Sequence, residues 1–120
     1  MQTVVMTPLF LADAKAAGVV SDEIDGIATL IASDPQAGDL IVGTGGARKV
    51  RVGGKGKGKS GGYRVITFYA APDVPVFLLR LVAKGQRADI SQGDRNTLRI
   101  VLSTLAETYR DGVRRRGGGL

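Results

Sequence analysis

The sequence predicts a small, single-domain α+β protein with an antiparallel sheet. Apolar residues recur at helical spacing over residues 8–33 and again after residue 91. Between these stretches, residues 63–70 and 74–83 are rich in β-branched and aromatic residues, as strands are, and the second half of residues 47–52 alternates basic and apolar residues, as a half-buried strand does. With a short strand at the N-terminus, the predicted order is one strand, two helices, three strands and one helix. Strands grouped in this way favour an antiparallel sheet over a parallel doubly wound fold.

The two N-terminal helices have recognisable boundaries. Thr7 followed by Pro8 is typical of an N-cap and a first helical position, and Gly18 is a typical stop. Ser21 is expected to cap the second helix, and its apolar residues repeat at helical spacing. Asp34, which precedes a proline, is expected to end it.

The C-terminal segment predicts one long amphipathic helix. Ser91, with Asp94 three residues later, resembles a capping box. One face of the helix is expected to contain Leu98, Val101, Leu102, Leu105 and Tyr109. We expect the domain to span residues 1–112 and the basic, glycine-rich residues 113–120 to be a disordered tail.

Charge is distributed very unevenly along the chain. The net charge is +6, yet no acid occurs between Asp39 and Asp73. That interval contains seven basic residues: Arg48, Lys49, Arg51, Lys55, Lys57, Lys59 and Arg64. A field of one sign attracts polyanions, so we expect the partner to be a nucleic-acid backbone.

Composition also limits the chemistry. The chain has no cysteine and no histidine, which excludes disulfides and thiolate zinc sites and removes the commonest general base. Catalysis would have to use Lys, Arg, Tyr, Asp or Glu, and we expect neither a metal nor a cofactor. The N-terminus does not read as a signal peptide and no apolar run is long enough to span a bilayer, so we expect a cytoplasmic protein without membrane contact.

Residues 53–60, GGKGKGKS, fit the P-loop pattern G-x-x-x-x-G-K-[ST]. A P-loop leads into a helix whose N-terminus faces the phosphates. Here the next segment, YRVITFY, reads as a strand, so nucleotide binding is disfavoured. Alternating glycine and lysine instead favour a rim that follows a phosphodiester chain. If the flanking strands form a hairpin, Lys49, Arg51 and Arg64 share one face, although the register is open at this stage.

Three blocks of sequence carry a family resemblance: GDLIVGTGGARKVR (38–51), GKGKSGGYRVI (56–66) and FLLRLVAK (77–84). In this order and spacing they resemble the RelE/HigB toxins of type II toxin–antitoxin modules, most closely the HigB-like branch. The resemblance runs from about residue 22 to residue 105. It implies a compact sheet flanked by helices, and an endoribonuclease that cleaves mRNA on the ribosome without a metal. It also implies a cognate antitoxin, in the HigB-like branch commonly a helix-turn-helix protein.

The resemblance also suggests roles for individual residues. Arg64 falls on the arginine of the family's S-x-G-Y-R segment, and we expect it to stabilise the phosphate in the transition state. Lys55 or Lys57 would be the general base, because a lysine crowded by cations has a lowered pKa. Lys84 or Arg87 would share the charge stabilisation. The remaining expected RNA contacts are Arg48, Lys49, Arg51, Lys59, Arg87 and Tyr69, the last by stacking on a base.

Two departures from the family pattern keep an alternative open. Val82 stands where a tyrosine is common, and Gly85 where an asparagine is usual. The chain is therefore either an active endoribonuclease or an RNA- or ribosome-binding module of the same fold that has lost catalysis. A DNA-binding protein is disfavoured, because no predicted helix is a basic recognition helix preceded by a turn. Tyr109 lies in the apolar stripe and is expected in the core.

Overall fold

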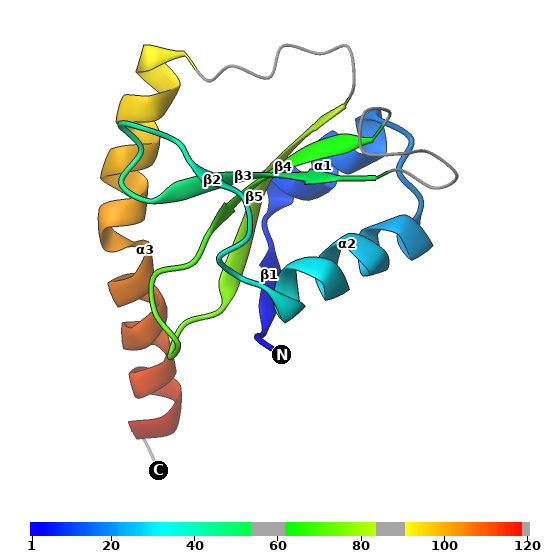
Figure 1. Ribbon diagram of the computed structural model, residues 1–120. Helices are drawn as coiled ribbons and strands as arrows, with labels where there is room; N and C mark the ends of the chain where they lie inside the picture. The colour runs from blue at the N-terminus through cyan, green and yellow to red at the C-terminus, as the bar shows by residue number, and fades with distance from the viewer. Residues whose placement is uncertain (54–61, 84–90, 119–120) are drawn as a thin grey trace.

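The computed structural model describes residues 1–53, 62–83 and 91–118 (Figure 1). Three helices and a five-stranded sheet make up this part of the chain, with the strands ordered β1-β5-β4-β3-β2. In sequence, the elements are β1 (Val4–Met6), α1 (Pro8–Ala16), α2 (Ser21–Ser33), β2 (Asp39–Leu40), β3 (Ala47–Val52), β4 (Tyr63–Phe68), β5 (Val76–Ala83) and α3 (Gln92–Gly118). The predicted α+β class is confirmed, and so is the element order except for β2, a two-residue strand that was not predicted.

The sheet is mixed, which corrects the prediction of a purely antiparallel one. Strands β2 to β5 pair antiparallel, but β1 pairs parallel to β5, with Val4 opposite Val76 and Met6 opposite Leu78. No hairpin fixes the direction of β1, because α1 and α2 follow it and cross the sheet before the other strands begin. Its position at the edge therefore depends on tertiary packing, which local sequence does not encode.

Helices cover both faces of the sheet, as Figure 1 shows: α1 and α2 lie on one side and α3 on the other. The first core has these buried members: Phe10, Ala14, Val19, Ile27, Ile31, Val50, Val52, Val65, Val76, Leu78 and Leu81. The second core, under α3, contains Ile41, Ala47, Ile66, Phe68, Phe77 and Leu102. Alternate residues of β3 and β4 therefore serve different cores, as the pleat of a strand requires.

The start of α1 follows the predicted chemistry, whereas the start of α2 does not. Thr7 Oγ accepts a hydrogen bond from the Phe10 amide at 3.3 Å and donates one to the Leu78 carbonyl at 2.8 Å, which ties the helix to β5. Ser21 is the first residue of α2 and Val20 is its N-cap, so the expected serine cap is wrong. The Glu23 carboxylate instead accepts a hydrogen bond from the Val20 amide at 3.4 Å.

Helix α3 begins as predicted and continues further. Ser91 Oγ accepts a hydrogen bond from the Asp94 amide at 3.1 Å. The helix extends beyond residue 112, where we expected a disordered tail, and ends at Gly118. Ion pairs at i, i+3 spacing, Glu107–Arg110 and Asp111–Arg114, support this last part. No helix in the described ranges combines the length and the hydropathy needed to cross a membrane.

The apolar stripe of α3 is narrower than the sequence predicts. Leu98, Leu102, Leu105 and Tyr109 belong to or pack against the second core. Tyr109 meets Phe77 edge-on with ring centroids 6.3 Å apart, which confirms its predicted role in packing. Val101 is 47% exposed, so its expected place in the core is wrong. The four packed residues follow i, i+4, i+7 and i+11, and Val101 lies beside this seam.

Asp13 of α1 closes one edge of the sheet. Its carboxylate accepts two hydrogen bonds from the Arg80 guanidinium, at 2.7 and 3.0 Å, and one from the Leu81 amide at 3.0 Å. Burial raises the pKa of Asp13, but the hydrogen bonds from Arg80 and Leu81 and the charge of Arg80 outweigh burial, so this pKa lies below its ordinary value of 3.8. The charged form of Asp13 is therefore favoured by folding.

We expect Asp13→Asn to lower the free energy of unfolding at pH 7 by roughly 1 kcal/mol, since the partner Arg80 is half exposed. A lowered pKa in the folded state contributes stability above about pH 4, and this contribution disappears as the pH falls through the folded-state pKa. Urea unfolding of both proteins between pH 7 and pH 2.5 measures the effect. The gap between them should narrow on acidification; a constant gap would contradict this account.

Candidate nucleic-acid interface

The pairing of β3 with β4 brings three predicted site residues to one face. Arg51 lies directly opposite Arg64, and Lys49 precedes Arg51 by two residues on the same strand. Opposite residues, and residues two apart along a strand, project to the same side of a sheet. We call Lys49, Arg51 and Arg64 the cationic face. Lys49 and Arg51 are exposed and Arg64 is half-buried. They project to the same side of the sheet as Ala47 and Ile66, which belong to the core under α3.

No ion pair among the described residues involves the cationic face, although Asp39 of β2 lies opposite Lys49. Arginines directly opposite each other repel, which costs stability in an ordinary sheet. None of the ion pairs among residues 1–53, 62–83 and 91–118 involves Lys49, Arg51 or Arg64. By contrast, Arg80 pairs with Asp13 and Arg110 with Asp73. Since Arg51 and Arg64 have no ion-pair partner among the described residues, they are available to an external anion.

Arg48, also expected to contact RNA, projects to the opposite side of the sheet. It alternates with Lys49, and its neighbour Val50 faces the core under α1 and α2. The Arg48 guanidinium donates a hydrogen bond to the Gly38 carbonyl at 3.2 Å. The structure therefore does not bring Arg48 together with Arg51 and Arg64.

Tyr69, which we expected to stack on a base, lies away from the cationic face, and so does Tyr63. Tyr69 packs against the core of α1 and α2, and Gln2 Nε2 donates to its hydroxyl at 3.2 Å. It follows the far end of β4, about 17 Å along the strand from Arg64. Tyr63 packs against the same core. Burial, followed by the charge and hydrogen bond of Glu23, raises the pKa of Tyr63, which keeps its hydroxyl protonated.

The other predicted site residues, Lys55, Lys57, Lys59, Lys84 and Arg87, lie outside the described residues. The chain on either side of them is described. Val52 lies opposite Tyr63, and Tyr63 lies opposite Ala83, at the end of the sheet that also holds Arg64. Tyr63 begins a strand, which confirms that the P-loop-like motif is not followed by a phosphate-binding helix.

The G-T-G-G part of the first sequence block has a structural role. Thr44 is fully buried, and its hydroxyl donates to the Ile41 carbonyl at 2.7 Å and accepts from the Ala47 amide at 3.0 Å. Gly45 has φ 78°, and a Cβ there would lie 3.6 Å from the Arg99 Cα of α3. These residues hold the turn before β3 against α3 and so support the strand that carries Lys49 and Arg51.

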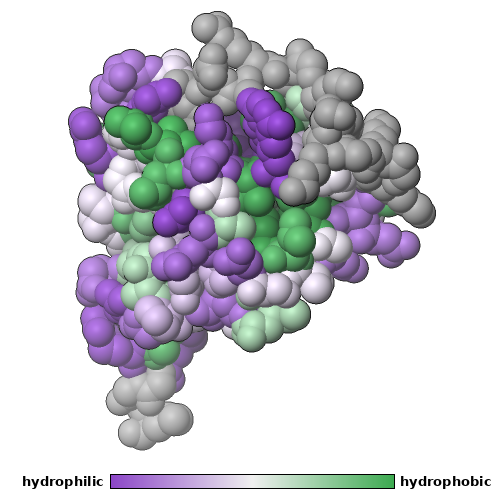
Figure 2. All heavy atoms as spheres, viewed as in Figure 1, coloured by the Kyte–Doolittle hydropathy of each residue, from purple (hydrophilic) through white to green (hydrophobic). Residues whose placement is uncertain are grey.

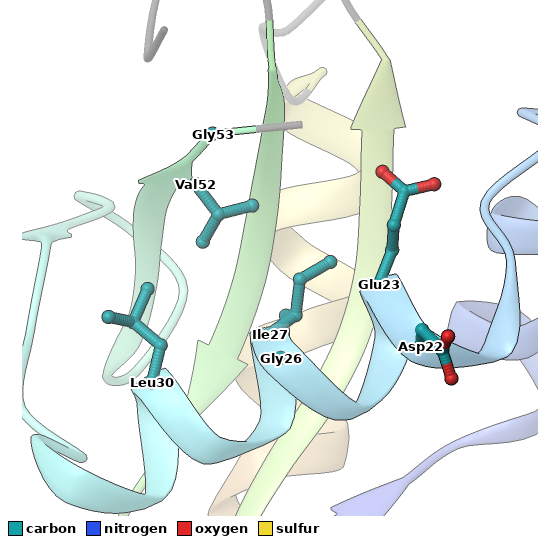
Figure 3. Close-up of a pocket in the computed structure, with 7 residues that line it drawn as sticks. All are labelled: Asp22, Glu23, Gly26, Ile27, Leu30, Val52 and Gly53. Carbon is teal, nitrogen blue, oxygen red and sulfur yellow. The ribbon is translucent and has the colours of Figure 1, made fainter. Parts of the chain in front are cut away.

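Sequence reasoning missed a groove on the other side of the sheet, between α2 and the end of β3. Its volume is about 410 Å³, and it is lined by Asp22, Glu23, Gly26, Ile27, Leu30, Val52 and Gly53 (Figure 3). Figure 2 shows apolar surface where α2 meets the sheet, bordered by hydrophilic residues. A glycine and an outward-facing leucine within one helix were the available signal, but neither is specific. We call this site the α2–β3 groove.

A comparison with protein families places the chain. Residues 29–115 match the family model described as RelE toxin of RelE / RelB toxin-antitoxin system. The matched region spans β2 to β5 and most of α3, and it includes the whole cationic face. The HigB-like branch stays a prediction. With most of the chain matched and the expected α+β fold present, the chain belongs to the RelE family, the toxins of toxin–antitoxin systems that are paired with a cognate antitoxin.

Proposed function

We propose that this protein is a ribosome-dependent endoribonuclease that cleaves mRNA during translation, with the cationic face holding the scissile phosphate. The observation that carries this proposal is the pairing of Arg51 with Arg64, two opposed cations that form no ion pair with an acid among the described residues. Two like charges directly opposite each other lower the stability of the fold. A phosphate bound to both arginines would replace this repulsion with two attractive interactions.

The reaction uses a nucleophile already present in RNA. The 2′-oxygen attacks the adjacent phosphorus while the bond from phosphorus to the 5′-oxygen breaks. The proton of the 2′-hydroxyl passes to a base, and the departing 5′-oxygen takes up a proton. The products are a 2′,3′-cyclic phosphate and a 5′-hydroxyl end. DNA lacks the 2′-hydroxyl and is not a substrate for this chemistry.

The residues of this chain supply charge and proton transfer. Arg64 and Arg51 stabilise the extra negative charge on the phosphorane, which is often the largest catalytic term. We assign the base to Lys55 or Lys57, and further charge stabilisation to Lys84. The chain has no histidine, so a lysine surrounded by cations is the amine best suited to lose a proton near neutral pH.

Base recognition has to come from elsewhere. The chain contains three phenylalanines, three tyrosines and no tryptophan. All six aromatic residues belong to or pack against one of the two cores: Phe10, Tyr63, Phe68, Tyr69, Phe77 and Tyr109. None is left to stack on a base beside Arg64. We therefore expect the ribosome, which positions the codon, to supply most of the selectivity.

A second candidate function is a module that binds ribosomal RNA without cutting it. The residue opposite Arg64 favours this alternative. Val82, opposite Arg64, stands where the family commonly has a tyrosine. Loss of an aromatic group at this position removes a possible stacking or acid group. The two functions differ in a single outcome, since both predict salt-sensitive binding to ribosomes but only the first predicts new RNA ends.

Controlled expression in bacteria separates these functions. We expect the wild type to arrest growth and to create new RNA 5′ ends inside translated frames. Arg64→Ala should do neither. Lys15→Ala, which removes an exposed cation from α1, should behave as the wild type. If well-expressed wild type produces no new ends, the proposal fails and the binding module is favoured.

A further inference from the structure

The turn between β2 and β3 lies against the N-terminal half of α3 (Figure 1). Arg95 of α3 donates a hydrogen bond to the Val42 carbonyl at 3.0 Å. Gly45 lies over Arg99, since a Cβ on Gly45 would be 3.6 Å from the Arg99 Cα and 3.7 Å from its Cγ. The turn therefore rests on the aliphatic stem of Arg99, an exposed residue whose guanidinium is left at the surface.

The same turn leads directly into the strand that carries the cationic face. Strand β3 begins at Ala47, and Lys49 and Arg51 follow on the side of the sheet that Ala47 shares with the core under α3. Lys49 is four residues from Gly45, at most about 13 Å, and Arg51 is about 7 Å further along the strand. Arg99 thus extends the line of Lys49 and Arg51 at its α3 end, over a distance that a few nucleotides of single-stranded RNA can span.

Arg99 lies in a part of the molecule that is poor in acids. Residues 95–106 of α3 and residues 40–52 contain neither Asp nor Glu. Arg95 lies one turn before Arg99, so two like charges four residues apart add to the positive field at a small cost in helix stability. The Arg99 guanidinium donates a hydrogen bond to the neutral Asn96 side chain at 3.3 Å, and no ion pair among the described residues involves it.

Two arginines near the other end of α3 are neutralised within the chain. Arg110 pairs with Asp73 and Glu107, and Arg114 pairs with Glu107 and Asp111. The acids of this long helix are therefore placed beside its C-terminal arginines and not beside Arg99. A cation that the fold leaves exposed and without an acid, next to an established row of cations, is suited to an external anion.

We propose that Arg99 and the 42–46 turn form a second binding site for an RNA phosphate, continuous with the cationic face. The site takes a phosphodiester a few nucleotides from the scissile one and holds the substrate strand without touching the reacting atoms. Val42, which is 80% exposed on the turn, offers an apolar contact to the ribose beside this phosphate. The inference rests on the proposed function, since it places RNA on the cationic face.

Two matched arginines of α3 test the site. Arg99→Gln removes the charge and keeps a stem to pack against the turn, whereas Arg115→Gln makes the same change at an exposed residue about 24 Å further along the helix. Each protein is titrated with ribosomes that hold an mRNA made uncleavable by 2′-deoxyribose in the exposed codon. We expect Arg99→Gln to weaken binding roughly tenfold and Arg115→Gln to stay within about twofold of the wild type. Unchanged affinity of Arg99→Gln, or equal weakening by both variants, would overturn the proposal.

Three further readouts separate a phosphate contact from a structural role. The slope of log affinity against log salt should fall by about 1 in Arg99→Gln, because one phosphate contact is lost. Arg99→Lys should recover most of the affinity, because it keeps the charge. In single-turnover cleavage, Arg99→Gln should need roughly tenfold more protein for its half-maximal rate and reach a saturated rate within about twofold of the wild type. A lower saturated rate with unchanged half-saturation would contradict the proposal.

The same titration with ribosomes that lack mRNA identifies the RNA that supplies the phosphate. A substrate phosphate predicts equal binding of the wild type and Arg99→Gln to these ribosomes. Weakening of the same size there would overturn the assignment to the substrate, because the phosphate would then belong to ribosomal RNA.

Failure of this inference is distinguishable from failure of the proposed function, since binding is measured on RNA that cannot be cut. If no protein cleaves ordinary mRNA but Arg99→Gln and Arg115→Gln differ in affinity as expected, the second phosphate site stands and the endoribonuclease proposal fails. If the wild type cleaves and Arg99→Gln binds and cleaves equally well, the endoribonuclease stands and the second site is wrong.

Discussion

Arg64→Ala is expected to reduce the rate of mRNA cleavage by about 100- to 1000-fold, the usual effect of removing one group that stabilises transition-state charge. The domain should remain folded. Arg64 is half-buried, forms no ion pair among the described residues and faces Arg51 across the strands, so its removal relieves repulsion. We therefore expect the free energy of unfolding to be unchanged or to rise by a few tenths of a kcal/mol, roughly.

Two measurements on the same protein check this result: single-turnover cleavage of ribosome-bound mRNA and urea unfolding. Arg64→Lys is a useful comparison, because it keeps the charge but loses the planar fork that binds two phosphate oxygens, and should recover only part of the activity. A variant that cleaves normally but has lost several kcal/mol of stability would show that Arg64 serves the fold and not the chemistry.

Gly38→Ala is expected to be the most damaging substitution of a surface residue. Gly38 is exposed, yet it has φ 90°, and a Cβ at this position would lie 2.3 Å from the Lys49 carbonyl oxygen and 2.8 Å from Val50 Cγ2. The left-handed backbone alone costs about 1–3 kcal/mol with a side chain present. The contact with the β3 backbone adds to this, because the strand that carries Lys49 has to shift.

Gly26→Ala is the matched control, since it makes the same chemical change in an open position of α2. No atom lies within 4 Å of its Cβ, and the higher helix propensity of alanine should stabilise the protein by about 0.5–1 kcal/mol. In thermal and urea unfolding, Gly38→Ala should lower the free energy of unfolding and Gly26→Ala should raise it. Equal stabilities would mean that Gly38 is not held against β3 as described.

Much of the fold follows from local sequence signals. The Thr7-Pro8 start of α1, the Ser91 cap of α3 and the hairpin of β4 with β5 each depend on residues close together in the chain. Features that depend on contacts between distant parts of the chain were not predictable in the same way. The parallel position of β1 depends on how α1 and α2 cross the sheet, and the exposure of Val101 depends on how α3 is rotated against the sheet.

The candidate site likewise contains some features that local sequence predicts and others that it does not. Lys49, Arg51 and Arg64 were grouped correctly, because strand alternation and one hairpin are sufficient to align them. Arg48 was included on charge alone, although a shift of one residue along a strand changes the face. The sequence distance from Arg64 to Tyr69 is short, but an extended strand places them at opposite ends of β4. The α2–β3 groove forms between distant segments of the chain, and no local sequence pattern predicts it.

The most direct test of the central claim, that the cationic face cleaves RNA by attack of the 2′-hydroxyl, is the chemistry of the RNA ends. Purified protein is added to one mRNA, either free or engaged by translating ribosomes, and the downstream fragments are examined for a 5′-hydroxyl or a 5′-phosphate. We predict cuts only in the translated mRNA, with 5′-hydroxyl ends, and none with Arg64→Ala. Binding to ribosomes without any cut, or cuts that persist in Arg64→Ala, would contradict the account.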